Sequence, residues 1–365
     1  MIITEANIIK TYNEKQQRQV ERYNKFSKLK SKCTLTEIAR KTKTPISTID
    51  GWRHGKIPYP LKIVLNLKQR KLLPLKIKQT RRFMVLLDCL AFIFGDGSIP
   101  KAANYCYFYG YHEDLKSLEN LIKKYFHIKT KLTDRTKNNS WLVVSDTAFA
   151  RLLVSLGAPT GDKAIRNFKF PHWIKSASKE IKKEFVEVLL GNELTTPSRV
   201  RQASFDHVRF SMKKSIDKVL NLIKFLEEFR QLLEEFKIKT KSAKVNWNDQ
   251  DKRKDGIITV ECELEVDNNR VNILKLWKTF QLKYATNKQN KFDKEIAEIL
   301  PYLKDQLQDC NLYRKAKELH FKGLGARRIS KKLNAPHKLG RISNWLSDRC
   351  KPKMLSFEQE LKEIF

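Results

Sequence analysis

The sequence predicts an α+β protein in which a duplicated central domain lies between two small helical domains. Two apolar stretches, 82–97 and 185–194, each have the length of one buried helix and each run into an acidic residue. A six-residue segment at 126–131 is repeated in similar form at 236–241. Both ends of the chain carry short amphipathic helices joined by tight turns. These observations predict two related halves with a helical module on either side.

The first apolar stretch ends at Gly95-Asp96-Gly97 and is too short to span a membrane, which indicates a buried helix. Ala91 and Gly95 lie four residues apart on one helical face, where their small side chains let a second backbone approach. Gly97 is the residue type that supplies a left-handed C-terminal cap. Asp96 then lies where exposed carbonyls and the negative helix end favour a cation. Taken alone, the pattern is more typical of a core helix followed by a turn than of a catalytic site.

The second apolar stretch, Phe185 to Leu194, repeats the pattern and reaches Glu193. Both stretches resemble the signature helix of the LAGLIDADG homing endonucleases. The second copy departs from the family at Leu194, where Gly is usual, at Val188, where a small residue lets the helices touch, and at Asn192, where Ala or Gly is common. A non-Gly residue at a left-handed cap is strained. We therefore expect a displaced Glu193.

The repeated segment supports two halves of like order. Phe126 to Lys131 matches Phe236 to Lys241, and each copy follows an amphipathic helix and leads into an apparent hairpin with a polar turn. Each half is therefore expected to run helix, strands, helix, strands, helix. The expected elements are helices 114–125 and 215–235, turns 134–140 and 246–256, return strands 141–144 and 257–264, and closing helices 147–156 and 269–280.

The linker between the halves carries the resemblance further. Leu156 to Lys163 and Phe170 to Ile174 resemble the Leu-Gly, Gly-x-Lys and Pro-x-Trp-Ile pattern that joins the halves in many members of the family. The resemblance implies an endonuclease domain at 79–305, with halves at 79–160 and 175–300. It also implies that these αββαββα halves are related by a pseudo-twofold axis and that their antiparallel sheets form a saddle over DNA.

The resemblance further implies a metal-dependent active site. By motif position Asp96 and Glu193 are the catalytic acids and metal ligands, and Gly95 and Asn192 beside them are further metal-site residues. Mg²⁺, with Mn²⁺ as a substitute, suits carboxylates that share it with water and phosphate oxygens. Basic residues on the sheets would neutralise phosphate charge, or would lie on a solvated or merely phosphate-touching face. The repeat predicts that the catalytic lysines are Lys131 and Lys241, or Lys129 and Lys239 on the alternate pleat.

The terminal segments are expected to be helix-turn-helix domains at 1–78 and 306–365. Thr34 and Glu37 have the spacing of a capping box, and Pro45 suits a first helical position. An Ile precedes a Trp by three residues in both modules, Ile49 and Trp52 in the first, Ile342 and Trp345 in the second. Hairpins used only for packing are the alternative.

DNA-binding residues are expected on the saddle strands and on both modules. Which strand residues face DNA depends on register, because a one-residue slip reverses every side chain. Their donors suit base edges or phosphates. The candidates are Arg199, Arg201, Gln202, Arg209, Lys129, Lys239, Asn246 and Asn248 on the strands, and Arg53, Lys56, Arg327, Arg328 and Arg341 on the modules.

Composition agrees with a polyanionic partner. The 365 residues hold 74 Lys plus Arg against 40 Asp plus Glu, a formal net charge of +34. No signal peptide, lipidation motif or long apolar span is seen, so a membrane partner is not expected. The six cysteines lack paired spacing, so no zinc site or disulfide framework is expected, and a reducing cytoplasm is the expected location. For a basic protein of this kind, association with the prokaryotic nucleoid is also expected. The chain also lacks the Cys or Ser start and His-Asn end of a self-splicing insert, which predicts a free-standing protein.

Two functions remain open. The first is a monomeric, site-specific double-strand DNA endonuclease of homing, mobile-intron type with a long, partly asymmetric target. The second is a catalytically weak or inactive DNA-binding regulator of the same fold, or an RNA-splicing maturase with intron RNA as partner. Retention of both acids favours the enzyme, whereas the extra modules and the irregular second helix favour the regulator.

Overall fold

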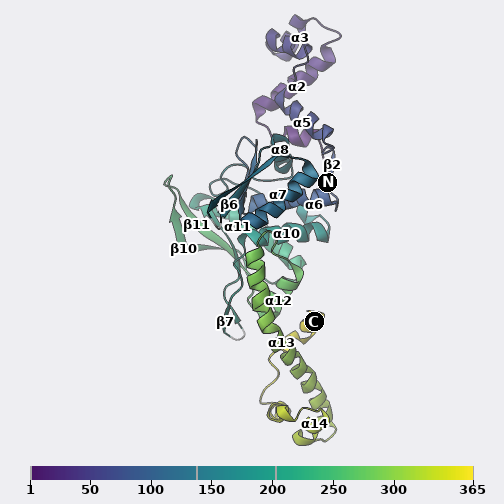
Figure 1. Ribbon diagram of the computed structural model, residues 1–365, viewed down its shortest axis with the longest axis vertical. Helices are drawn as coiled ribbons and strands as arrows, with labels where there is room; N and C mark the ends of the chain where they lie inside the picture. The colour runs from purple at the N-terminus through teal and green to yellow at the C-terminus, as the bar shows by residue number, and fades with distance from the viewer. Residues whose placement is uncertain (1, 137–138, 202–203, 365) are drawn as a thin grey trace.

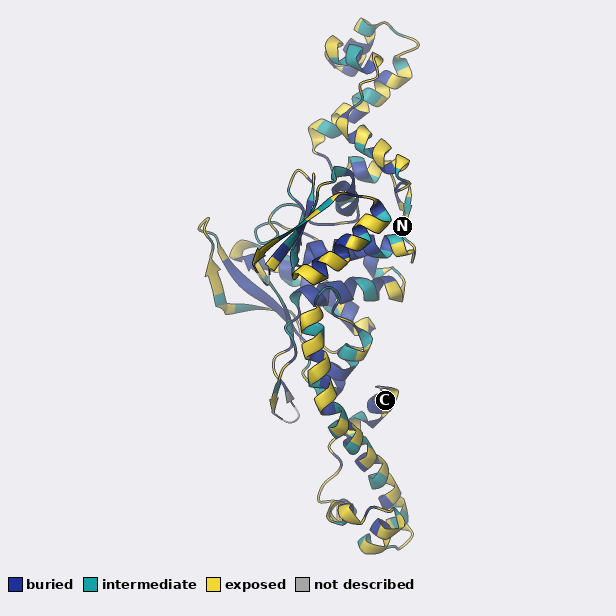
Figure 2. Cartoon of the chain, viewed as in Figure 1, coloured by how far each residue is buried: buried dark blue, intermediate teal, exposed yellow. Residues whose placement is uncertain are grey.

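The computed structural model describes residues 2–136, 139–201 and 204–364. The protein is elongated, with a mixed helix-and-sheet domain in the middle and a helical module at either end of the long axis (Figure 1). Buried residues concentrate in the middle, while the modules and the outer surface of the long helix α13 (Thr286–Phe321) are largely exposed (Figure 2). No helix in the described ranges is long and apolar enough to cross a membrane.

The first half of the central domain follows the expected element order. Its four strands form one antiparallel sheet in the order β3-β4-β6-β5. Cys106, Phe108, Leu142 and Val144 point into the core from this sheet. The elements are α6 (Arg81–Phe94), β3 (Gly97–Ser98), β4 (Cys106–Gly110), α7 (His112–Phe126), β5 (Thr130–Thr136), β6 (Asn139–Val144) and α8 (Thr147–Ser155).

The second half has a smaller main sheet. Its three strands are ordered β10-β11-β9, and β7 and β8 pair with each other instead of joining it. The expected polar turn at 246–256 is largely strand, because β10 continues past a register shift between Asn246 and Gln250. The elements are the short linker helix α9 (His172–Lys175), α10 (Lys179–Glu193), β7 (Arg199–Arg201), β8 (Ser204–Phe205), β9 (Arg209–Ser215), a 3-10 turn (Ile216–Lys218), α11 (Val219–Glu235), β10 (Lys244–Lys252), β11 (Ile258–Glu265) and α12 (Arg270–Thr279).

The sequence repeat is also a repeat of conformation. His127 and Lys237 both adopt the left-handed region, with φ of 53° and 61°, directly after the helices α7 and α11. The next residues, Ile128 and Ile238, are both buried. The two copies therefore make the same turn from a helix toward a strand, as the duplicated order predicts.

The helices α6 and α10 pack together at the centre of the domain. The ring centroids of Phe94, on α6, and Phe185, on α10, lie 5.9 Å apart. A Cβ atom at Gly95 would lie 2.6 Å from Cβ of Asn192, so the absence of a side chain at Gly95 allows this approach. The sequence predicted close approach of a second backbone at Gly95, and the structure places the side chain of Asn192 there.

The N-terminal module leaves the central domain and returns to it. Phe26, Ile38, Ile49 and Trp52 form its own small core, and the Thr34 capping box is present. Pro45 is the N-cap of its second helix, one position earlier than expected. The first and last elements pack on the central core through residues such as Ile3, Ile8 and Val64. The elements are β1 (Ile2–Ile3), α1 (Glu5–Ile9), α2 (Glu14–Leu29), α3 (Leu35–Thr42), α4 (Ile46–Arg53), α5 (Tyr59–Gln69) and β2 (Leu75–Lys76), which pairs with β1.

The C-terminal module repeats this arrangement. Ala316, Ile329, Ile342 and Trp345 form its core. Tyr313 meets Trp345 edge to face at 5.8 Å, as Tyr23 meets Trp52 at 5.3 Å in the first module. The last helix returns to the central core through Leu361. Beyond α13 the elements are α14 (Ala326–Lys332), a 3-10 turn (Pro336–Lys338), α15 (Leu339–Leu346), a second 3-10 turn (Leu355–Phe357) and α16 (Glu358–Ile364).

Candidate active site and nucleic-acid interface

The two predicted acids lie at the ends of adjoining helices. Asp96 is the second residue after α6 and is exposed, and Glu193 is the last residue of α10 and is half-buried. The surrounding protein still removes much of the water from both carboxyls. This desolvation raises the pKa of Asp96, and it raises the pKa of Glu193 to about 8 with a further contribution from the charge of Asp96. The charge of Asp96 therefore acts on the carboxyl of Glu193.

A lysine caps each helix beside the acids. Lys163 Nζ donates to the carbonyl oxygens of Ile93 at 2.9 Å, Phe94 at 3.0 Å and also Gly95, at the end of α6. Lys288 Nζ donates to the carbonyl oxygens of Gly191 at 3.0 Å and Asn192 at 2.6 Å, at the end of α10. An ammonium group at a helix C-terminus satisfies orphan carbonyls and offsets the negative helix end.

The capping lysines also interact with the acids. Burial lowers the pKa of Lys163 to about 8 and lowers that of Lys288, while the negative charges of Asp96 and Glu193 oppose both shifts. The three hydrogen bonds of Lys163 use all three of its N–H groups. Lys288 makes two in the described part of the chain, so one N–H is left to face a ligand. In the sequence, Lys163 stood out only as part of the linker, and Lys288 was not predicted.

A third lysine supports the first cap. Lys214, on β9, is fully buried, and its ammonium group donates to the carbonyl oxygens of Lys163 at 2.7 Å and of Arg166. The ammonium group also lies 4.3 Å from the centroid of the Phe168 ring. Burial lowers the pKa of Lys214 to about 8. A buried cation is costly unless it is well bonded, so these contacts hold the linker backbone firmly at the site.

The expected left-handed caps are absent. Leu194 has φ −72° and ψ 132°, an extended conformation, and Gly97 begins the strand β3. The chain leaves each helix in extended form, with Gly97 opposite Phe108 in the first sheet and Leu194 in a single bridge to Phe210. The prediction of strain at Leu194 is therefore wrong. Gly97 is needed for space, because a Cβ there would lie 2.8 Å from the carbonyl oxygen of Phe92.

The donor set fits a hard divalent cation. Asp96 and Glu193 offer carboxylate oxygens, and the carbonyls of Gly95 and Asn192 are close by, although each carbonyl also accepts from a capping lysine. Nδ2 of Asn192 is buried without a hydrogen-bond partner in the described residues. The described chain holds no group of three or more His, Cys, Asp or Glu side chains suited to a metal ion. Two carboxylates with water and substrate oxygens are what Mg²⁺ prefers.

The lysines nominated from the repeat lie elsewhere on the sheets. Lys241 forms an ion pair with Glu265 at 2.6 Å. Lys131 is exposed on β5, the edge strand of the first sheet, and Lys129 and Lys239 are exposed before their strands. The lysines whose charges act on Asp96 and Glu193 are Lys163 and Lys288. A catalytic role for Lys131 and Lys241 stays a prediction.

Several predicted DNA-binding residues of the second half are already paired. Arg199 contacts Glu295 at 2.7 Å and Glu298, which ties β7 to α13. Arg209 contacts Glu263 at 3.0 Å. Asn246 and Asn248 line a groove of about 530 Å³ over the second sheet. Arg201 lies in β7, and Gln202 lies outside the described residues.

The module residues differ in their availability. Arg53 is exposed at the end of α4 and Lys56 shortly after it, and Arg327 and Arg328 are exposed at the start of α14. Arg341 instead pairs with Asp309 and, at 3.5 Å, with Asp305 on α13. Part of its role is therefore to hold α15 against α13.

The outer face of the first sheet is aromatic. Tyr107 stacks on Tyr109 at 6.1 Å and on Trp141 at 5.8 Å between ring centroids. The guanidinium group of Arg135 lies 4.5 Å from the centroid of Trp141. Because these residues alternate with the core residues of β4 and β6, they share the face opposite the core. The sequence contained the alternating pattern, but it was not singled out.

No protein-family model matches the chain. It is 30% identical over 266 residues to the DNA-directed RNA polymerase subunit Rpo1N of Methanocaldococcus jannaschii, covering 67% of this chain and 19% of that protein. It is 26% identical to the replication factor C small subunit of the same organism, covering 97% of this chain and 20% of that protein. The tRNA-splicing ligase RtcB of Pyrococcus furiosus is 29% identical, over 50% of this chain and 20% of that protein. The chain thus spans about a fifth of the length of these curated relatives.

Among solved structures, the chain is similar to variants of the homing endonuclease I-DmoI, with a TM-score of 0.35 and 14% identity over 55% of this chain and 91% of that one. It is also similar to the LAGLIDADG meganuclease I-AabMI bound to uncleaved DNA, with a TM-score of 0.31 and 12% identity over 61% of this chain and 92% of that one. Both TM-scores are low.

Proposed function

We propose that this protein is a site-specific double-strand DNA endonuclease of homing type. The observation that carries the proposal is the pairing of Asp96 and Glu193 at the ends of two adjoining helices, each helix capped by a lysine. Cleaving two strands requires negatively charged metal ligands near two phosphates, and two helices that end together supply one acid each. The excess of 34 positive charges supports a polyanionic substrate.

In the proposed complex the two antiparallel sheets form a saddle over DNA, with the helix ends beneath the phosphates to be cut. Each sheet has its apolar side in the core and its other side free for a ligand. The exposed Arg53, Lys56, Arg327 and Arg328 would add phosphate or base contacts at the two ends of a long target.

The proposed mechanism assigns distinct work to the residues of this chain. Asp96 and Glu193 would hold a divalent cation, which, when bound, supplies charge neutralisation at the phosphate and a more acidic water. Lys163 orients the end of α6 through three carbonyls and keeps Gly95 and Asp96 in place. Lys288 has an N–H left for a phosphate oxygen, where it would offset charge that develops during cleavage.

The similarity to three unrelated kinds of protein supports the proposal that the chain is encoded by a mobile genetic element. The chain resembles about a fifth of each of three proteins whose names describe a polymerase subunit, a replication factor and an RNA ligase. A segment common to proteins with such different activities is not what any of those activities requires. Similarity to part of all three is the distribution expected for a mobile sequence whose product cuts DNA.

The second candidate is a DNA-binding protein of the same architecture that does not cut, such as a regulator or an RNA-splicing maturase. The observation in its favour is that ammonium groups already sit on the carbonyls of Gly95 and Asn192. If these carbonyls are needed as metal ligands, the lysines compete with the metal.

The decisive experiment selects duplexes from a random pool with the full chain and then incubates the selected duplexes with Mg²⁺. The parent should cut both strands. Asp96→Asn and Glu193→Gln should retain binding and lose cutting, because the acids add negative charge and give no attraction to DNA. Glu180→Gln, at the opposite end of α10, is the matched control and should cut like the parent. Selective binding without a nick in Mg²⁺ or Mn²⁺ would support the second candidate instead.

A further inference from the structure

The outer face of the second sheet is built in two charged layers. Along β11, Val260, Cys262 and Leu264 point into the core, and the alternate residues Glu261, Glu263 and Glu265 point to the opposite face. We call these three glutamates the carboxylate layer. They are only 6%, 6% and 7% exposed, because basic side chains from both neighbouring strands cover them.

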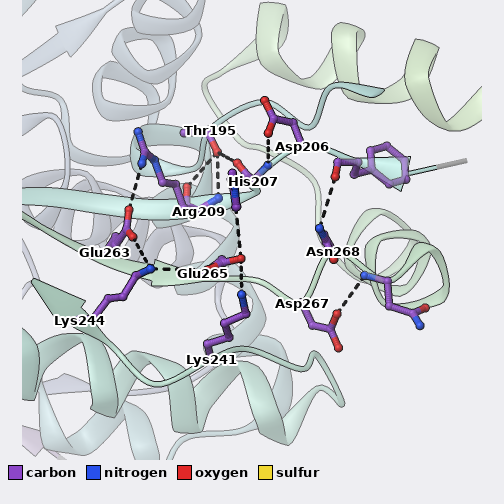
Figure 3. A network of polar contacts seen from close by, with 12 residues as sticks. Thr195, Asp206, His207, Arg209, Lys241, Lys244, Glu263, Glu265, Asp267 and Asn268 are labelled. Atoms are coloured by element: carbon purple, nitrogen blue, oxygen red, sulfur yellow. Dashed lines mark hydrogen bonds and ion pairs between the residues drawn. The ribbon is translucent and has the colours of Figure 1, made fainter. Parts of the chain in front are cut away.

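The basic residues over the carboxylate layer are each held by it (Figure 3). Arg209, on β9, lies 3.0 Å from Glu263 and 3.6 Å from Glu261. Lys244, on β10, lies 3.0 Å from Glu263 and 3.8 Å from Glu265. Lys241 lies 2.6 Å from Glu265. These cations are outermost, since the side chains of Arg209, Lys244 and Lys241 are 36%, 57% and 63% exposed.

The carboxylate layer lowers the attraction of this face for phosphates. Three negative charges beneath three cations leave little net charge, so non-specific binding to a polyanion gains little here. In return, each cation loses side-chain freedom before any ligand arrives, so less entropy is lost when it binds in that geometry. This matters most for Arg209, whose planar fork is specific for a pair of acceptors.

The surface above these residues is shaped to receive a ligand. A groove of about 530 Å³ is lined by Arg209, Lys244, Asn246, Glu263 and Glu265. Oε1 of Glu261 accepts no hydrogen bond from any described residue although its side chain is buried. Nε of Arg209 lies 3.6 Å from this oxygen, so Glu261 attracts Arg209 by charge rather than through a hydrogen bond.

The first sheet has a different surface in the equivalent place. Its outer face carries the stacked rings of Tyr107, Tyr109 and Trp141, with Arg135 over Trp141. On the strands of that sheet, the described acid is Asp134, which bonds Ser140 and His112. The carboxylate layer is therefore a property of the second half.

We propose that the carboxylate layer positions Arg209 and its neighbours to read base edges, so that the second half-target is read more strictly than the first. The inference rests on the proposed DNA substrate. Arg209, held through Glu263 and Glu261, presents its fork to the O6 and N7 atoms of a guanine in the major groove. Glu261, Glu263 and Glu265 act as positioning residues, since the cations lie between them and the ligand.

The test measures the affinity of the full chain for its selected duplex and for a scrambled duplex of equal length, over a series of salt concentrations. Glu263→Gln should raise affinity for the scrambled duplex about threefold and lower the selected-to-scrambled ratio by roughly tenfold. Substituting the target base by base should show that the positions at which Glu263→Gln discriminates less than the parent lie in one half of the target. Arg209→Lys, which keeps the charge and loses the fork, should lower the ratio without raising scrambled binding.

The control is Asp255→Asn at the turn between β10 and β11, where Asp255 pairs with Arg253. It removes the same charge from the same hairpin outside the groove, and its ratio should match that of the parent. Equal changes in Glu263→Gln and Asp255→Asn would overturn the inference, because net charge alone would then explain both. If the parent selects a duplex, and Glu263→Gln and Arg209→Lys have the same selected-to-scrambled affinity ratio as the parent, the inference is overturned and the proposed function stands. A parent with no selective binding would overturn both.

Discussion

Replacing Glu193 with Gln should stabilise the protein in mildly alkaline solution and have little effect in acid. Burial and the charge of Asp96 raise the pKa of Glu193 from 4.5 to about 8 in the folded chain. Between these two values the folded state keeps a proton that the unfolded state has released. Stability therefore falls as pH rises through this interval and levels off above the folded-state pKa. Gln cannot ionise, so Glu193→Gln removes this loss.

The magnitude can be worked from the surroundings of Glu193. A full shift of this size corresponds to about 5 kcal/mol of destabilisation at high pH. Glu193 is half-buried rather than enclosed, and its ionised form attracts Lys163 and Lys288, an attraction that Gln lacks. We therefore expect Glu193→Gln to raise the free energy of unfolding by about 2 kcal/mol near the upper end of the interval and by less than about 0.5 kcal/mol at about pH 5.

Urea unfolding of parent and variant at the two pH values measures this difference. Glu180→Gln is the control with the opposite sign, because backbone hydrogen bonding lowers the pKa of Glu180 and its charge suits the start of α10. Mg²⁺ should stabilise the parent at the higher pH and stabilise Glu193→Gln much less, if Glu193 binds the cation. A Glu193→Gln variant that is less stable than the parent in alkali, or equally changed at both pH values, would refute the reasoning.

Three further outcomes are expected. Gly191→Ala should destabilise the protein by about 1–3 kcal/mol in urea unfolding and slow any cleavage, because its Cβ would overlap the carbonyl oxygen of Lys283. A variant as stable as the parent would show that the segment around Lys283, between α12 and α13, moves freely. Trp345→Ala should destabilise the C-terminal module by about 3–5 kcal/mol, and hydrogen exchange should show the loss there and not in the central domain; uniform loss would mean that the module does not unfold on its own. Arg53→Ala combined with Lys56→Ala should reduce the salt dependence of DNA binding by about two phosphate contacts, and an unchanged slope would remove α4 from the interface.

Local patterns in the sequence predicted local structure well. The capping box at Thr34 and Glu37 depends on residues three apart, and the structure contains it. The repeat at Phe126 and Phe236 predicted two like turns because it includes the helix end, the left-handed residue and the next core residue. In each case the interacting groups are neighbours in the chain, so their spacing alone carries the information.

The cap prediction failed because it treated each helix apart from the strand after it. A left-handed residue ends a helix when the chain must turn away from its axis. Here the chain instead continues in extended form, into the strand β3 with Gly97 opposite Phe108 in one half, and into a single bridge between Leu194 and Phe210 in the other. Gly97 and Leu194 therefore occupy equivalent extended positions. Only Gly97 must lack a side chain, because a Cβ there would lie too close to the end of α6.

The capping lysines could not have been paired with their helices from spacing. Lys163 comes from the linker and Lys288 from the start of α13, and each reaches carbonyls far away in the sequence. Lys163 also depends on Lys214, which looked like one of many surface lysines in this basic chain. Main-chain carbonyls leave no mark in a sequence, so a lysine that binds them is indistinguishable from a solvated one.

Both ends of each terminal module are attached to the central domain, which limits how the module could approach DNA. Each leaves the central domain and returns to its core, through Ile3 and Val64 at one end and through Leu361 at the other. The 36 residues of α13 span about 54 Å, the length of about 16 base pairs of B-DNA. In the proposed complex, modules fixed in this way would contact outlying segments of one long duplex, in one orientation relative to the central domain. For the same reason, deleting residues 1–78 or 306–365 would remove central-core side chains together with the module. Substitutions on α4 and α14 therefore test DNA binding by the modules without that damage.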